Sequence, residues 1–154
     1  SWTGRLLLEK GQYRKAAEDI DIYESEASEK YSLQRFVELI QQDFQNRLAW
    51  TVNEGSTHPT VSFTENMLTK VKAGSEYKVQ VKVSEEADYY YNWWYYHELD
   101  DADLDLEIDG WGSSIMNVTI PEDAEKGTKF HFMLELEDAI TGHKSMYRRV
   151  VEVK

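Results

Sequence analysis

The sequence predicts a mainly β protein, an antiparallel β-sandwich preceded by a helical segment. Three observations lead to this fold class. From about residue 60 onward, six to eight short strand-type stretches follow one another, separated by turn-type residues and by no helical pattern. Before residue 53 the hydrophobic period is helical instead. The chain has 154 residues and 41% hydrophobic content, enough to bury the core of one domain.

The N-terminal part predicts one short strand and one amphipathic helix. Leu6–Leu8 form an apolar run typical of a strand, whereas the loosely helical spacing in Gln12–Lys30 is equally compatible with a helix and with none. Apolar residues spaced by three and four predict a helix from Ser32, its N-cap, to about Leu48. We expect this apolar stripe to pack on the β domain or on a neighbour outside the chain. Its members are Leu33, Phe36, Val37, Ile40, Phe44 and Leu48.

Alternating apolar and polar residues predict the strands, which follow a linker at Asn53–Pro59. The clearest example is EYKVQVKVSEE, in which Tyr77, Val79, Val81 and Val83 point inward. The other predicted strands begin at Val61 and lie in DLDLEIDG, SIMNVTIP, TKFHFMLELED and SMYRRVVEVK. Turn-type residues separate them at 85–88, 109–112, 122–127 and 138–142.

The run YYYNWWYYHE, residues 89–98, contains seven aromatic side chains among ten. Because a strand shows alternate residues to opposite faces, one face receives Tyr89, Tyr91, Trp93 and Tyr95. We assign that face to the core, with Trp93 packed against residues such as Val79, Val81 and Phe132.

The opposite face of this strand carries Tyr90, Trp94 and Tyr96, and two interpretations of it remain open. In the first, the three rings stack on a sugar, while Asn92 and Glu98, which are in phase with them, bind its hydroxyl groups. In the second, the face is internal packing beneath the predicted helix. A second candidate for sugar binding is Trp111, in the loop sequence DGWGSS.

The composition excludes several classes of function. A net charge of −12 argues against binding to nucleic acid and to an anionic membrane surface. The absence of cysteine excludes disulfides and thiolate chemistry, and no apolar run approaches the ~20 residues of a membrane span.

No motif predicts an enzyme, a cofactor or a metal site. The four histidines lie on separate segments without metal-ligand spacing. Asp101, Asp103 and Asp105 imitate the start of a calcium loop, but Leu106 occupies the position that requires glycine. A strand edge with solvated charges explains these acidic residues better.

Several motifs resemble one family of secreted bacterial proteins that are described as cellulose-binding. YNWWYYHE is similar to its Y-R-W-W-Q-Y-x-E strand, SWTGR to its W-G-G-R motif, and FHFMLELEDAITGHKSMYRRVVEVK to its closing hairpin. QNRLAW, followed by a linker with His58 and Pro59, resembles its interdomain junction. The resemblance is strongest at Asp43–Trp50, Trp93–Glu98 and His131–Val153.

The resemblance implies a nucleoside-hydrolase-like domain followed by an immunoglobulin-like β domain. Residues 1–52 would be the helical tail of the upstream domain, and residues 57–154 the immunoglobulin-like sandwich. The expected role is that of a non-catalytic carbohydrate-associated module, binding cellulose or another polysaccharide, in a larger protein that is secreted, periplasmic or on the cell surface. The alternative is a structural domain that stabilises or orients the hydrolase-like domain and has no ligand. The family's glycine-containing turn before the aromatic strand reads Ser84–Asp88 here and lacks glycine, so no ion is expected there.

Overall fold

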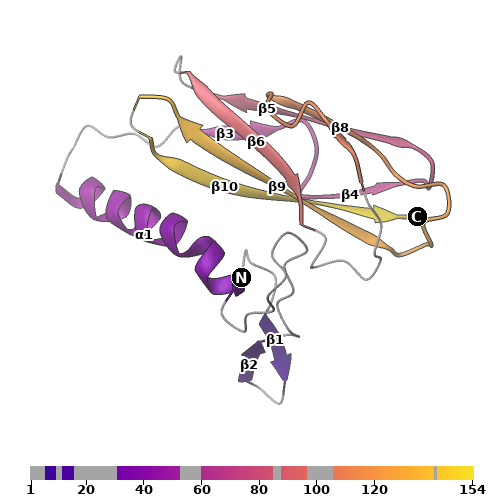
Figure 1. Cartoon of the computed structure of the whole chain (residues 1–154), viewed down its shortest axis with the longest axis horizontal. Coiled ribbons are helices and arrows are strands. Elements are labelled where there is room, and N and C mark those ends of the chain that lie inside the picture. Colours follow the sequence, from indigo (N-terminus) through magenta and orange to yellow (C-terminus); the bar gives the residue numbers. More distant parts are fainter. Residues whose placement is uncertain are drawn as a thin grey trace.

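The computed structural model shows a β-sandwich with one long helix beside it (Figure 1). The structure describes residues 6–9, 12–15, 31–52, 60–84, 88–96, 106–140 and 142–154.

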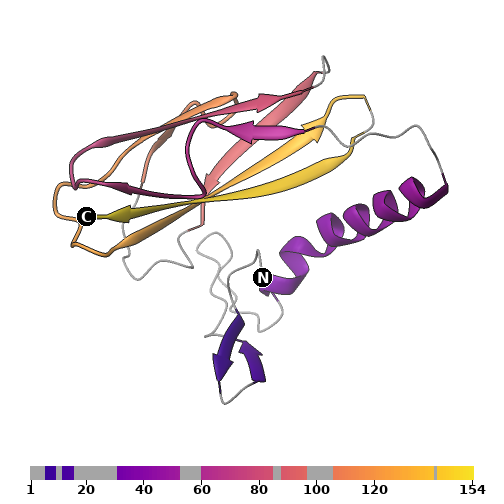
Figure 2. The same ribbon diagram turned by 180° about the vertical axis from the view of Figure 1, so that it is seen from behind.

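Two four-stranded sheets form the sandwich, and the view from behind shows them as two layers (Figure 2). The first sheet has the order β4-β10-β9-β6 and the second β3-β5-β8-β7. The strand bounds are β3 Val61–Phe63, β4 Leu68–Val71, β5 Glu76–Val83, β6 Tyr89–Tyr95, β7 Ile108–Asp109, β8 Ile115–Thr119, β9 Lys129–Asp138 and β10 Lys144–Val153.

The strand order confirms the predicted immunoglobulin-like sandwich. In that fold the strands A, B, E and D form one sheet and C, F and G the other. The order β3-β5-β8-β7 corresponds to the first set and β6-β9-β10 to the second.

Strand β4 is the exception to the predicted antiparallel pairing. It runs parallel to β10, with Leu68 opposite Val150 and Val71 opposite Val153. The sequence did not predict this strand, because LTKV is short and carries only two apolar residues.

The core lies between the two sheets and is built by the inward residues of each strand. Tyr77, Val79, Val81 and Trp93 are all buried in it, as the alternation predicts. Phe132 packs in the same cluster, so the assignment of Trp93 to the core is confirmed.

Two polar side chains also lie inside this sandwich. Arg149 is 9% exposed, and its guanidinium carbon lies 3.3 Å from the centre of the Phe63 ring. Its Nη1 donates a hydrogen bond of 2.7 Å to the carbonyl oxygen of Arg148. Burial lowers the pKa of Arg149, and burial raises the pKa of Tyr77 to about 12.

Helix α1 spans Tyr31–Val52 and confirms the predicted helix, with four more residues at its end. It begins one residue before Ser32, so this serine lies inside the first turn and is not the N-cap. The helix does not combine the length and hydropathy needed to cross a membrane, and no other helix occurs in the described part of the chain.

Two expectations for the N-terminal part have different outcomes. The strand expected at Leu6–Leu8 is present as β1 (Leu6–Glu9), paired in a hairpin with β2 (Gln12–Lys15). A helix beginning at Gln12 is therefore wrong, because these residues pair as a strand. Residues 16–30 and the predicted linker at 53–59 lie outside the described residues, as does 97–105. Of the strand expected in DLDLEIDG, only the first three residues fall in that last range, and Ile108–Asp109 form β7.

Candidate functional site

The candidate site lies on the outer face of the sheet β4-β10-β9-β6. Along β6, Trp93 points into the core, whereas Tyr90 and Asn92 are exposed and Trp94 is half-buried. The predicted alternation is thus observed. Tyr90 and Trp94 are four positions apart, which places them about 13 Å from each other along the strand.

The register of the sheet adds polar side chains to this face. On β9, Glu137 lies opposite Tyr90 and Glu135 lies opposite Asn92. Lys144 of β10 pairs with both carboxylates, with Nζ 2.7 Å from Glu135 Oε1 and 3.4 Å from Glu137 Oε2. The hydrogen bond that Lys144 donates to Glu135 is the main reason why the pKa of Lys144 is raised, so the lysine remains protonated at neutral pH.

Helix α1 covers the other end of the same face. Phe36 is fully buried and stacks on Trp94, with ring centroids 6.5 Å apart and planes at 23°. Phe36 also meets the edge of Tyr96, with centroids 6.0 Å apart, and these rings enclose Met133 in a small second core. Tyr96 is 1% exposed and therefore cannot stack on a ligand in this arrangement.

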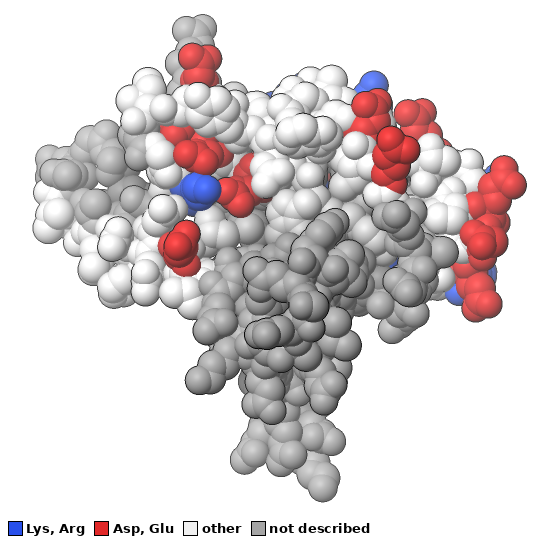
Figure 3. Space-filling model, in the orientation of Figure 1, with Lys and Arg blue, Asp and Glu red and all other residues white. Residues whose placement is uncertain are grey.

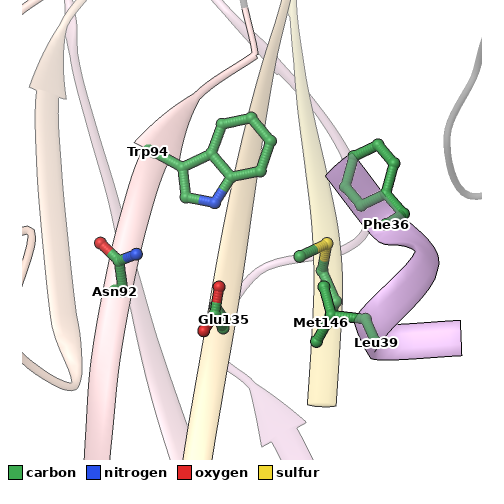
Figure 4. A pocket seen from close by; sticks show the side chains of 6 residues that line it. All are labelled: Phe36, Leu39, Asn92, Trp94, Glu135 and Met146. Carbon is green, nitrogen blue, oxygen red and sulfur yellow. The ribbon is translucent and has the colours of Figure 1, made fainter. Parts of the chain in front are cut away.

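Between the covered and the open ends lies a hollow of about 230 Å³. In Figure 4 the indole of Trp94 leans from β6 across β9 toward Phe36, and Asn92 and Glu135 lie beside it. The hollow thus combines an aromatic wall with an amide and a carboxylate. Its lining residues are Phe36, Leu39, Asn92, Trp94, Glu135 and Met146.

Trp111 is brought to the free edge of β6, although it is distant from that strand in sequence. The backbone N–H of Trp93 donates to the carbonyl oxygen of Trp111 at 2.8 Å, and the Trp93 indole Nε1 donates to Ser113 at 3.1 Å. Gly110 turns the chain with a φ of +76°, where a Cβ would clash with the carbonyl oxygen of Ile115. The Trp111 side chain itself is 65% exposed.

The structure brings together three of the predicted sugar-binding residues, Tyr90, Asn92 and Trp94, and places Trp111 beside their strand. Tyr96 has the predicted phase but lies under the helix. Glu98 is outside the described residues.

Sequence reasoning missed the residues that other elements contribute to this face. Four of them lie on β9 and β10. The pairing register of the sheet places them beside the β6 residues, and the alternation within β6 does not specify that register. The other two come from helix α1. The missed residues are Glu135, Glu137, Lys144, Met146, Phe36 and Leu39.

The charge on this side of the molecule is mainly negative. Acidic side chains outnumber basic ones over the described part of the face in Figure 3. Within the described residues, no three His, Asp or Glu side chains are arranged to hold a metal ion. The arrangement is suited to an uncharged ligand that offers hydroxyl groups and an apolar ring face.

Residues 78–152 match the family model described as "Cellulose-binding protein Sde0182, C-terminal domain". The resemblance is to that family. The match includes all of β6 and β9 and most of β10, so these strands of the candidate face lie within the matched region. The family resemblance inferred from the motifs is confirmed.

Solved structures agree with this assignment at the level of the fold. The chain is similar to a nucleoside hydrolase-related protein from Saccharophagus degradans that is described as associated with carbohydrate metabolism. The two are 24% identical with a TM-score of 0.69, over 82% of this chain and 34% of the other. This chain therefore spans about a third of the length of that protein.

More distant similarities involve other proteins. The SrpA adhesin of Streptococcus sanguinis is 11% identical over 64% of this chain and 60% of its own, with a TM-score of 0.41. The titin M3 domain is 12% identical over 64% of this chain and 99% of its own, with a TM-score of 0.38. No curated protein matches the chain.

Proposed function

We propose that this chain is a non-catalytic module that binds a neutral polysaccharide, such as cellulose, within a larger secreted or cell-surface protein. The observation that carries this proposal is the hollow on the outer sheet face, where Trp94 lies beside Asn92 and Glu135. The match of residues 78–152 to a family model described as cellulose-binding supports the same ligand class.

The chemistry of the lining fits a sugar ring. The indole of Trp94 offers a flat apolar surface to the C–H face of a pyranose, the kind of large amphipathic contact that Trp and Tyr provide at interfaces. Asn92 can both donate and accept hydrogen bonds, and the Glu135 carboxylate accepts them from hydroxyl groups. The neighbouring Lys144 holds Glu135 in place through their 2.7 Å ion pair.

The charge distribution favours a neutral glycan over an acidic one. Two carboxylates, Glu135 and Glu137, share the single ammonium group of Lys144, and the whole chain carries −12. A uronic acid or a sulfated sugar would meet like charges on this face.

Binding to soluble and insoluble neutral glucans tests the proposal, with wild type compared to Glu135→Gln and Asn92→Ala. Asn92→Ala removes the amide, and Glu135→Gln removes the charge of the acceptor while keeping an acceptor oxygen; neither variant removes an aromatic ring. A hydrogen bond to a charged group is worth about 1.5–3 kcal/mol and one between neutral groups about 1 kcal/mol, so Glu135→Gln should weaken binding by about threefold or more.

The control is Glu152→Gln, on the outer face of the same sheet. Glu152 also forms a 2.7 Å ion pair, with Lys70, and its side chain is similarly exposed, at 19% compared with 22% for Glu135. It lies at the β4 edge and does not line the hollow, so its replacement should leave the affinity unchanged. The proposal fails if wild type binds none of the glucans, or if both glutamate variants behave alike.

A second role is favoured by the free side of α1. Phe36 faces the sheet, but the side chains of Val37, Ile40, Phe44 and Leu48 are between 37% and 61% exposed. Such an apolar stripe normally packs against another element. We propose that it packs on a nucleoside-hydrolase-related part of a longer protein, because the similar solved protein extends well beyond the region matched here.

Phe44→Asp tests this docking. In the chain alone the substitution should change the unfolding free energy little, since Phe44 is 61% exposed. In a longer chain that carries the hydrolase-related part, the same substitution should lower the unfolding temperature of that part. An equal response in both chains would contradict the docking role.

A further inference from the structure

We infer that the hollow holds the end of a single glycan chain and does not bind the flat face of a crystalline one. This inference rests on the proposed function and adds the form of the polysaccharide that is recognised. Three features of the hollow carry it, namely a closed end, an open end and a small volume.

Phe36 of helix α1 closes the hollow at the end of β6, where it contacts Trp94 and Tyr96. Phe36 and Tyr96 are 0% and 1% exposed, and Met133, between them and the sheet, is 0% exposed. Protein atoms therefore fill the space beyond Trp94. A sugar chain that follows β6 along its outer face must stop at the indole.

The helix also forms the wall on the β10 side. Leu39 projects from α1 and lines the hollow together with Met146 of β10 (Figure 4). A chain that crosses the strands from β6 toward β10 meets this wall. The same helix therefore blocks a sugar chain in two directions: along β6 beyond Trp94, and across the strands toward β10.

The opposite direction along β6, from Trp94 toward Tyr90, is open. Tyr90 is 65% exposed and lies on the same strand face, about 13 Å from Trp94. Asn92, between them, is also exposed. Sugar units that follow the one beside Trp94 can therefore extend over Asn92 and Tyr90 toward solvent.

The size of the hollow fits one terminal unit. Its volume of about 230 Å³ lies below the roughly 300–1,000 Å³ of sites that enclose drug-sized ligands. Trp94 is half-buried in its wall, so a flat crystal surface would contact only part of the indole. Among the described residues, the large aromatic side chains exposed enough to meet such a surface on or beside β6 are Tyr90 and Trp111.

The test counts binding sites on a soluble neutral β-glucan by calorimetry, before and after limited cleavage by an endo-acting glucanase. Cleavage raises the number of chain ends while the mass of glucan stays constant. We expect the number of sites per gram to rise in proportion to the ends, and short oligosaccharides to bind within about threefold of the polymer's affinity per end, because the contacts are the same.

A variant pair locates the site. Leu39→Trp should fill the hollow and weaken oligosaccharide binding by at least tenfold. Ile40→Trp, at the next position of the helix, is the control, because Ile40 is 44% exposed and does not line the hollow. Circular dichroism and unfolding curves confirm that both variants fold.

The outcomes separate this inference from the proposed function. If the chain binds glucan but the number of sites per gram does not change with the number of chain ends, end recognition is wrong and polysaccharide binding is still supported. If Leu39→Trp leaves the oligosaccharide affinity unchanged, the hollow is not the binding site. Failure of the wild-type chain to bind both polymer and oligosaccharide overturns the proposed function and end recognition together.

Discussion

The ring of Phe36 on α1 stacks on that of Trp94 on β6, with centroids 6.5 Å apart and planes at 23°. These residues are 58 positions apart in the sequence, and their contact divides the outer aromatic face in two. On one side, Tyr96 is buried by the helix. On the other, Tyr90 and Asn92 are open to solvent. Internal packing therefore describes one end of the face, and the open end retains the features of a binding surface.

Phe36→Ala should release the helix from the sheet. Truncation of a buried Phe costs about 3–5 kcal/mol, although part of this loss is recovered if the helix separates and the rest of the domain stays folded. Hydrogen exchange should show faster exchange in α1, and Trp94 fluorescence should shift to longer wavelength. Phe44→Ala is the control on the same helix, since Phe44 is 61% exposed and its truncation should cost within about 0.5 kcal/mol. Equal effects of the two truncations would contradict the packing described.

Trp93→Ala and Trp111→Ala should differ greatly in stability. Trp93 is 2% exposed in the core and donates its indole hydrogen bond to Ser113, so its truncation should cost about 3–5 kcal/mol. Trp111 is 65% exposed, so its truncation should lower the unfolding free energy by about 0.5 kcal/mol or less. Denaturant unfolding measures both. A large loss for Trp111→Ala would mean that its side chain packs more tightly than its exposure indicates.

Gly110→Ala should destabilise the turn that carries Trp111. Both Gly110 and the control Gly127 have a positive φ, of 76° and 89°, which costs a non-glycine residue about 1–2 kcal/mol. At Gly127 nothing lies within 4 Å of the added Cβ, whereas at Gly110 it meets the Ile115 carbonyl oxygen. Gly110→Ala should therefore lower the unfolding temperature more than Gly127→Ala does. The reverse order would contradict the turn geometry.

Stability should fall at alkaline pH in part because of Tyr77. Burial raises its pKa to about 12 in the folded protein, whereas the ordinary value is 10.0. Below pH 10 the phenol is protonated in both states. Between about pH 10 and 12 the unfolded state loses this proton first, so the unfolding free energy falls by about 2–3 kcal/mol from this group.

Tyr77→Phe should flatten that alkaline decline in unfolding experiments between pH 9 and 12. Tyr90→Phe, which changes a phenol that is 65% exposed, should leave the decline as in wild type. If the two variants follow the same pH dependence, the burial of Tyr77 is not the cause.

The amino-acid sequence by itself determined the fold class, the long helix and the inward face of most strands. The alternation in Glu76–Val83 and in the aromatic run was sufficient for this, because side chains on a strand point to opposite faces in turn. The assignment of Trp93 to the core rested in addition on the usual place of a tryptophan in the middle of a sandwich strand, which is the core. The predicted phase of Tyr90, Asn92 and Trp94 is likewise local information.

Only the tertiary structure decided which part of the aromatic face is open. Both faces of β6 are aromatic, so the hydrophobic pattern does not distinguish them. The helix position is set by the contact of Phe36 with Trp94 and Tyr96, which no local pattern encodes. Glu135 and Lys144 reach the hollow through strand register, a relationship between segments distant in sequence. The candidate site depends on such long-range contacts, and a single sequence specifies them only through the packing of the whole chain.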